Sequence, residues 1–168
     1  AAIHALLGKG ETTRVYTQPI DPLYTAFRHL QSREVYAIHG GWVEKHHPPL
    51  GPAIAGRFDF ARAVTDRQVS TARAMRIEFA AHMQALLANG GVLVAPTVPG
   101  PAPRLDDSED TLDRYRHEAM VFLQPAGLAG LPQLVLPAGT VDDAPVGISL
   151  IGARGSDLAL LELADRLG

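Results

Sequence analysis

Histidine and glutamate side chains gather between residues 39 and 47 and are the first candidates for chemistry. The cluster contains His39, Glu44, His46 and His47. Neutral imidazoles with a carboxylate can hold zinc. However, the spacing matches no metal-binding template, and Gly40 and Gly41 interrupt a helix that would align His39 with the later histidines. We expect polar loop histidines and no metal; a zinc hydrolase using His39, Glu44 and His46 remains one alternative.

Serine is the second candidate, because a hydroxyl beside a base on a glycine-rich turn can attack a carbonyl group. The chain has five serines: Ser32, Ser70, Ser108, Ser149 and Ser156. The first three fall on predicted helix or in an acidic loop. Ser149 lies within a predicted strand, and Ser156 fits a helix cap. We therefore interpret all five serines as structural.

Lysine and arginine give no stronger signal. The two lysines, Lys9 and Lys45, stand in a glycine turn and near a helix end, where a buried neutral base is not expected. The segment around Lys9 also lacks the pattern of a phosphate-binding loop. Arginines that could pair with a substrate carboxylate are more typical of surface ion pairs, and these are Arg57, Arg62, Arg67, Arg73 and Arg76.

Composition excludes several classes of protein. The 168 residues are 46% hydrophobic and carry a net charge of -3 without a basic stripe, so we expect a sizeable core and no nucleic-acid partner. Cysteine is absent, which excludes disulfides and thiolate metal sites. No apolar run approaches the roughly 20 residues that span a bilayer. We expect no membrane span, no cofactor and a cytoplasmic location.

The first half of the chain is predicted to be mostly helical. Residues 1–8 are typical of a helix end, and residues 14–17 of a short strand. A helix follows from Asp21 to about Gly40-Gly41, and the prolines of residues 46–52 indicate a loop. From about Thr65, apolar residues recur at helical spacing until Asn89-Gly90-Gly91.

The second half alternates strands and helices. The apolar run of residues 91–96 predicts a strand covered on both faces, and a helix is expected over residues 111–123. Glycines and prolines of residues 125–132 predict tight turns. Residues 133–137 and 146–151 predict two antiparallel strands joined by a hairpin-like loop. A final helix over 158–167 has Leu158, Leu161 and Ala164 on one face.

Four ordered segments resemble the amidase-signature family. The strongest is the apolar strand followed by Pro96-Thr97-Val98-Pro99. The others are the Glu34 to Trp42 stretch, the Leu128-Ala129-Gly130-Leu131-Pro132 segment leading to Leu136-Pro137-Ala138-Gly139, and Pro145 to Gly152 with its closing helix. The resemblance covers about residues 20–168, and the members that the chain resembles are small-amide, allophanate and carboxybiuret hydrolases.

The resemblance implies acyl transfer from an amide by two serines and a lysine in a glycine- and serine-rich N-terminal core. No position of this chain matches those residues, so no catalytic residue is assigned. It further implies that Thr97, Val98 and Pro99, and the turn from Gly127 to Leu131 with Leu128, approach the substrate pocket. Many relatives have asparagine where this chain has Gly127, which argues against a polar role for that turn.

We therefore expect an α/β fold with a mixed central sheet flanked by helices, as the C-terminal part of one amidase-like domain over residues 1–168. Residues 1–50 would form its helix-strand-helix entry, 51–90 a loop and long helix, and 91–168 the strands and closing helix. Because the chain begins at Ala1 and its first methionine is Met75, we expect it to be cut from something longer.

The predicted function is to shape the pocket of an amidase that hydrolyses a small amide or urea-like C–N bond. The chain alone is expected to be inactive, and its expected partner is an N-terminal catalytic part or companion chain. The alternative is a non-catalytic binding or assembly module of the same fold. Without its partner, the chain is expected to aggregate or form a homodimer, because apolar surface would be uncovered.

Overall fold

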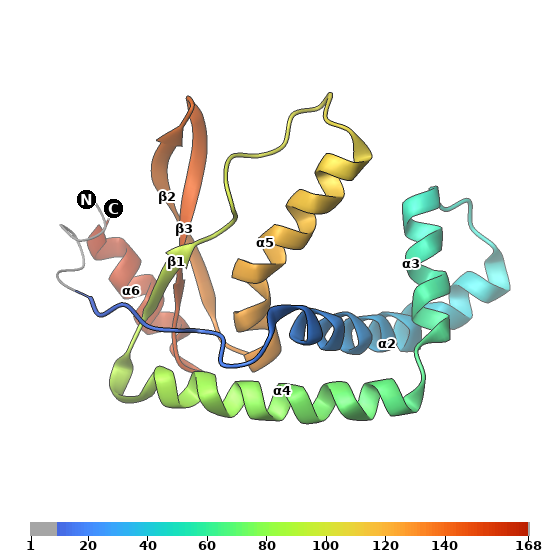
Figure 1. Cartoon of the computed structure of the whole chain (residues 1–168), viewed down its shortest axis with the longest axis horizontal. Coiled ribbons are helices and arrows are strands. Elements are labelled where there is room, and N and C mark those ends of the chain that lie inside the picture. Colours follow the sequence, from blue (N-terminus) through green and yellow to red (C-terminus); the bar gives the residue numbers. More distant parts are fainter. Residues whose placement is uncertain (1–9, 168) are drawn as a thin grey trace. The chain divides into compact units, whose positions relative to one another are not determined.

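The computed structural model describes residues 10–167, which form helices and a small sheet (Figure 1). These residues divide into two compact units. The helical unit comprises residues 18–80, and the sheet unit comprises the described residues 10–17 and 81–167. The α/β class is confirmed, since three strands occur together with helices. The helix expected over residues 1–8 lies outside the described part of the chain.

Helices α2 (Ile20–His46) and α3 (Pro52–Ala63) pack against each other in the helical unit. Helix α2 starts near the expected residue but continues through Gly40-Gly41, so the predicted stop there is wrong. It is capped by His47, whose backbone is left-handed (φ 44°) and whose N–H donates to the Val43 carbonyl at 2.9 Å. This is a common way to close a helix.

Helix α3 was not expected from the sequence, because the prolines before it indicated only a loop. Residues 47–51 are the loop, and Pro52 is the first residue of α3. Proline suits that position, since its fixed φ fits a helix and its missing N–H would have had no partner there. The same residue type therefore ends one segment and begins another.

Helix α4 (Asp66–Leu86) confirms the helix expected from about Thr65. It is followed by a short 3₁₀ turn over Ala88–Gly90, in which Asn89 and Gly90 both have positive φ. Asparagine and glycine tolerate that conformation better than other residues. The predicted stop signal is therefore confirmed.

The sheet consists of β1 (Leu93–Pro96), β2 (Gln133–Val141) and β3 (Ala144–Ile151) in the order β1-β3-β2 (Figure 1). Both pairings are antiparallel, which confirms the hairpin expected between the last two strands. The strand expected over residues 14–17 is wrong, because the backbone there is irregular.

Helix α5 (Glu109–Ala129) is capped by Ser108, whose hydroxyl accepts a hydrogen bond from the Thr111 N–H at 3.3 Å. It extends past the expected end at residue 123 and contains Pro125. Proline inside a helix costs a hydrogen bond and some strain. Residues 124–126 are all buried, and this packing offsets the cost.

Helix α6 (Asp157–Leu167) closes the chain as expected, but it buries a different face. Leu160 is buried, whereas Leu158 and Leu161 are 74% and 53% exposed. Other fully buried side chains of the sheet unit are Met83, Leu87, Leu128, Leu150 and Ile151. Within residues 10–167, no helix is long and apolar enough to cross a membrane.

Candidate functional site

Three polar side chains form a hydrogen-bonded row across one face of the sheet. Gln133 on β2 donates from Nε2 to the Ser149 hydroxyl on β3 at 2.7 Å. Ser149 Oγ in turn donates to Thr97 Oγ1 at 3.0 Å. Thr97 directly follows β1, so the row joins all three strands. We call Gln133, Ser149 and Thr97 the polar row.

Strand register explains why these three side chains meet. Ser149 lies opposite Ala95 on one side and Val135 on the other. Thr97 and Gln133 are two residues away from those partners, and side chains two apart point to the same face of a sheet. The Thr97 N–H also donates to the Gly147 carbonyl at 3.2 Å, which continues the pairing beyond β1.

Ser149 and Gln133 are not among the site residues predicted from the sequence. Ser149 was interpreted as a structural strand residue, and it is indeed completely buried. The available signal was its polar side chain within the apolar run of residues 146–151, because a buried hydroxyl needs hydrogen-bond partners. Thr97, by contrast, was among the predicted site residues.

The segment after Thr97 leads away from the sheet toward α5. Val98 is half-buried and Pro99 is exposed. The Tyr115 hydroxyl on α5 donates to the Gly100 carbonyl at 3.2 Å. Thr97 to Gly100 is therefore held at one end by β3 and at the other by α5.

Gly127 and Leu128 do not lie in a turn, so that prediction is wrong. Both belong to the last turns of α5, with Gly127 exposed and Leu128 buried. The chain turns only at Gly130, which has φ 65°, and the Leu131 N–H donates to the Ala126 carbonyl at 3.0 Å. Their proximity to substrate remains a prediction.

A second polar group is partly buried against α5. The Tyr16 hydroxyl donates to the Val121 carbonyl at 2.6 Å and accepts from Gln124 Nε2 at 3.1 Å. Burial raises the pKa of Tyr16 to about 12, although the Gln124 hydrogen bond opposes the shift. Gln124 is fully buried, and its Oε1 atom has no hydrogen-bond partner among the described residues. The phenol is therefore a structural anchor and stays protonated at neutral pH.

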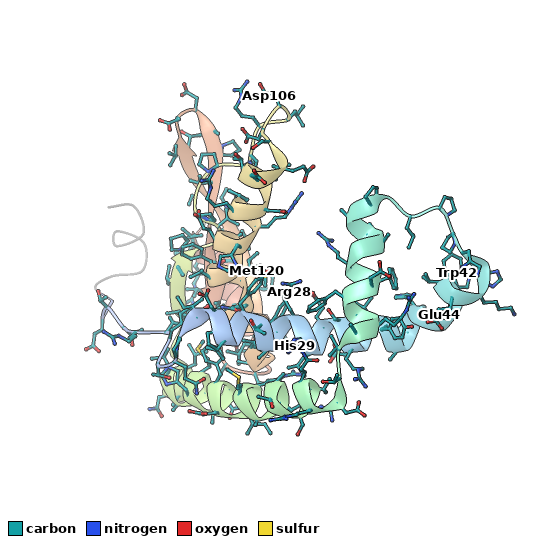
Figure 2. All side chains as sticks on the ribbon, turned by 45° about the vertical axis from the view of Figure 1, so that its right-hand side comes forward. Arg28, His29, Trp42, Glu44, Asp106 and Met120 are labelled. Atoms are coloured by element: carbon teal, nitrogen blue, oxygen red, sulfur yellow. The ribbon has the colours of Figure 1, made fainter. Side chains whose placement is uncertain are left out.

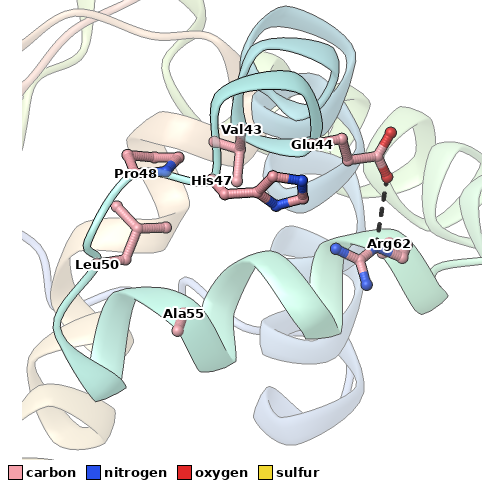
Figure 3. Close-up of a pocket in the computed structure, with 7 residues that line it drawn as sticks. All are labelled: Val43, Glu44, His47, Pro48, Leu50, Ala55 and Arg62. Carbon is pink, nitrogen blue, oxygen red and sulfur yellow. Dashed lines mark ion pairs between the residues drawn. The ribbon is translucent and has the colours of Figure 1, made fainter.

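The helical unit contains an open cavity of about 270 Å³ at the C-terminal end of α2 (Figure 3). Its charged wall is the ion pair between Glu44 and Arg62, with 3.5 Å between Oε1 and Nε. Tyr36 donates a hydrogen bond to Glu44 and accepts one from Arg62 at 3.4 Å. This hydrogen bond is the largest cause that raises the pKa of Arg62. Because the two charges neutralise each other, the cavity offers no free charge to a ligand.

The histidine and glutamate cluster does not assemble into a metal site. Across residues 10–167, no group of three or more metal-ligating side chains comes together. The His46 ring lies 5.5 Å from the ring of Trp42, while Glu44 pairs with Arg62 (Figure 3). Arg28 and His29 lie on the same helix (Figure 2). Both contact the Phe60 ring, with the Arg28 guanidinium carbon 4.4 Å from its centroid.

Serine and lysine side chains do not form a nucleophile and base pair within the described residues. Ser108 caps α5, the Ser156 hydroxyl donates to the Ala153 carbonyl at 2.7 Å, and Ser149 belongs to the polar row. Lys45 is exposed near the end of α2. Lys9 lies outside the described part.

Comparison with known proteins places these features in context. The family model described as Amidase matches residues 44–161. Over 145 aligned residues, the chain is 37% identical to Amidase 1 of Arabidopsis thaliana. The aligned region covers 86% of this chain and 34% of that protein. It is 31% identical to the translocon at the outer membrane of chloroplasts 64 of Pisum sativum, covering 83% of this chain and 24% of that protein.

A solved structure agrees with the sequence matches. An allophanate hydrolase of Kluyveromyces lactis superposes with a TM-score of 0.69 at 26% identity, covering 89% of this chain and 25% of that one. The chain thus spans about a third or less of the length of the proteins it matches.

Proposed function

This chain belongs to the amidase family, and from that membership we propose that it is the C-terminal part of an enzyme that hydrolyses the C–N bond of a small amide or urea-like substrate. The observation that carries the proposal is the family match over residues 44–161. A further part or companion chain supplies the catalytic serine and lysine groups. The chain covers only 34% of Amidase 1, which is consistent with such a division.

The contribution of this chain is to shape the substrate pocket. Thr97 to Pro99 form a wall fixed between β3 and α5, and the end of α5 around Gly127 and Leu128 forms a second element of that pocket. The catalytic serine attacks the carbonyl carbon, backbone N–H groups stabilise the oxyanion, and the pocket walls select the acyl or amine group. Our proposal requires no metal and no cofactor in this chain.

In this proposal the enzyme acts in the cytoplasm on a small amide. It has no nucleic-acid partner and no membrane partner. Exposed Leu158 and Leu161 on α6 support the need for a covering partner, because burying leucine side chains away from water is favourable. In the absence of that partner, self-association into a homodimer is the expected substitute.

The test is a fusion in which this chain replaces the corresponding C-terminal part of Amidase 1 from Arabidopsis thaliana. We call this protein the reconstituted amidase. Ammonia release from primary aliphatic amides, measured beside the truncated Amidase 1 alone as control, should appear only in the fusion. A folded monomeric fusion that releases no ammonia from a panel of amides and ureas would contradict the enzyme proposal.

The non-catalytic binding module is the second candidate. It is favoured by the 31% identity to a chloroplast translocon component. The intact mass of the assembly purified from its natural source separates the two candidates. A companion chain that brings ammonia release supports the amidase, whereas a stable complex without turnover supports the binding module.

A further inference from the structure

The polar row has a fixed direction of hydrogen bonding. Gln133 Nε2 carries only donor hydrogens, so Ser149 Oγ must accept at that end. The single Ser149 hydrogen is then directed to Thr97 Oγ1. A hydroxyl has one donor hydrogen and two acceptor lone pairs. The hydroxyl hydrogen of Thr97 is therefore the free end of the polar row.

The free end is also sterically open. Ser149 is completely buried, whereas Thr97 is half-buried and the neighbouring Val135 is 49% exposed. A Cβ at Gly147 would lie 3.4 Å from Thr97 Oγ1 and 3.0 Å from Val135 Cγ1. The absence of a side chain at Gly147 therefore leaves the hydroxyl uncovered on that side.

Within residues 10–167, the Thr97 hydroxyl makes no hydrogen bond other than the one it accepts from Ser149. A hydroxyl that already accepts a charge-neutral hydrogen bond becomes a somewhat better donor, since hydrogen-bond chains polarise one another. An oxygen acceptor placed beside it is thus bound more favourably than a methylene group of equal size, which would leave the donor unpaired.

We propose that Thr97 is a specificity-determining residue whose hydroxyl donates to an acceptor oxygen of the substrate, and that Ser149 and Gln133 are the positioning residues that fix its direction. The class of substrate is an amide with a second oxygen acceptor, such as an ether or carbonyl oxygen, near the scissile bond. This inference deepens the proposed function and rests on it for the nature of the ligand.

The test compares two amides of nearly equal size in the reconstituted amidase. Methoxyacetamide has an ether oxygen where butyramide has a methylene group. The unmodified protein should prefer methoxyacetamide in kcat/KM, and Thr97→Val should reduce that preference by up to about tenfold, because it removes the donor with which only methoxyacetamide can pair. Thr97→Ser, which keeps the hydroxyl, should keep the preference and controls for misfolding.

The positioning residues are tested by reversing the direction of the hydrogen bonds in the polar row. In Gln133→Glu the carboxylate can only accept, so Ser149 donates to it and then accepts from Thr97. The Thr97 hydrogen is now occupied, and the preference for methoxyacetamide should fall as in Thr97→Val although Thr97 is intact. Ser149→Ala removes the direction altogether and should give a smaller, several-fold loss of preference.

Binding is followed separately from turnover by the ¹³C-methyl resonance of Thr97 during titration with each amide. Selective shifts with methoxyacetamide but no ammonia release would support this inference and contradict the proposed function. Hydrolysis with equal losses on both amides in Thr97→Val would overturn this inference and leave the proposed function standing. An unchanged preference in Gln133→Glu would overturn the role of the row.

Discussion

Gly40 lies so close to the ring of Tyr36 that a Cβ at Gly40 would be 2.9 Å from the ring carbon Cδ2. The two residues are four apart on α2, the spacing at which helix side chains meet. Tyr36 cannot easily withdraw, since its hydroxyl is hydrogen-bonded to Glu44 and Arg62. The neighbouring Gly41 has nothing within 4 Å of its Cβ position.

This pair of glycines gives a matched stability test. Gly41→Ala should stabilise the chain by about 0.5–1 kcal/mol, because alanine loses less backbone entropy in a helix. Gly40→Ala gains the same stabilisation from backbone entropy, but its methyl group must displace the Tyr36 ring. Overpacking of this kind costs about 1–3 kcal/mol. Urea unfolding should therefore move in opposite directions for the two variants. Equal stabilisation by both would show that the Tyr36 ring moves freely.

A tighter contact joins Gly152 to the start of α6. A Cβ at Gly152 would lie 2.2 Å from Ser156 Oγ and 3.2 Å from Leu160 Cδ2. Ser156 cannot rotate away without losing its hydrogen bond to the Ala153 carbonyl. Gly152→Ala should therefore destabilise the chain by about 1–3 kcal/mol in thermal or urea unfolding.

The double variant identifies the cause of that loss. In Gly152→Ala combined with Ser156→Ala, the Oγ atom is absent, so the two changes should cost less together than the sum of their separate costs. Strict additivity would mean that the clash with Ser156 is not the source. The remaining loss then belongs to Leu160.

Tyr16 predicts a specific alkaline pH dependence. Its pKa is about 12 in the folded chain, against about 10 in an unfolded one. The unfolded state thus loses its proton first, so the stabilising contribution is complete below pH 10 and is lost as pH rises from about 10 through about 12. Ultraviolet titration should show a late ionisation step for Tyr16.

Tyr16→Phe is the control for that assignment. The late-ionising step should disappear, and the alkaline loss of stability should become less steep. At neutral pH the variant should be less stable by about 1–3 kcal/mol, because the Val121 carbonyl and Gln124 Nε2 lose their buried partner. A late step that persists in Tyr16→Phe belongs to a different tyrosine.

The sequence predicts elements well where local patterns agree with packing. Helix α4 has an apolar side chain every three or four residues and an Asn-Gly-Gly stop, and the hairpin of β2 and β3 has a short polar turn. Both are determined by neighbours in the chain. Predictions failed where side-chain packing matters more than residue type: at Gly40 the Tyr36 ring occupies the space beside the glycine, and α5 passes Pro125 because burial offsets its cost.

The candidate site shows the same limit. Thr97 could be found because the resemblance marks its segment. Gln133 and Ser149 could not, since their roles depend on a strand register that places residues 16 and 52 positions apart in hydrogen-bond contact. The turn at Gly127 was placed wrongly because the burial of residues 124–126 keeps Pro125 and Gly127 within the last turns of α5.

The hairpin turn supplies the last prediction. Asp142 and Asp143 have φ of 48° and 61°, the left-handed pair required by a tight turn in which Asn-Gly is the favoured sequence. Aspartate tolerates this conformation at a cost that glycine avoids. Asp142→Asn with Asp143→Gly should therefore stabilise the chain by about 0.5–1 kcal/mol in urea unfolding.

The bulge of β2 gives the opposite expectation. Gly139 has φ of 111° in that bulge, a conformation that alanine rarely adopts, so Gly139→Ala should destabilise the chain. A stabilising Gly139→Ala would mean that the bulge relaxes to fit alanine. The left-handed backbone at Gly139 would then not be required for the register of β2 against β3.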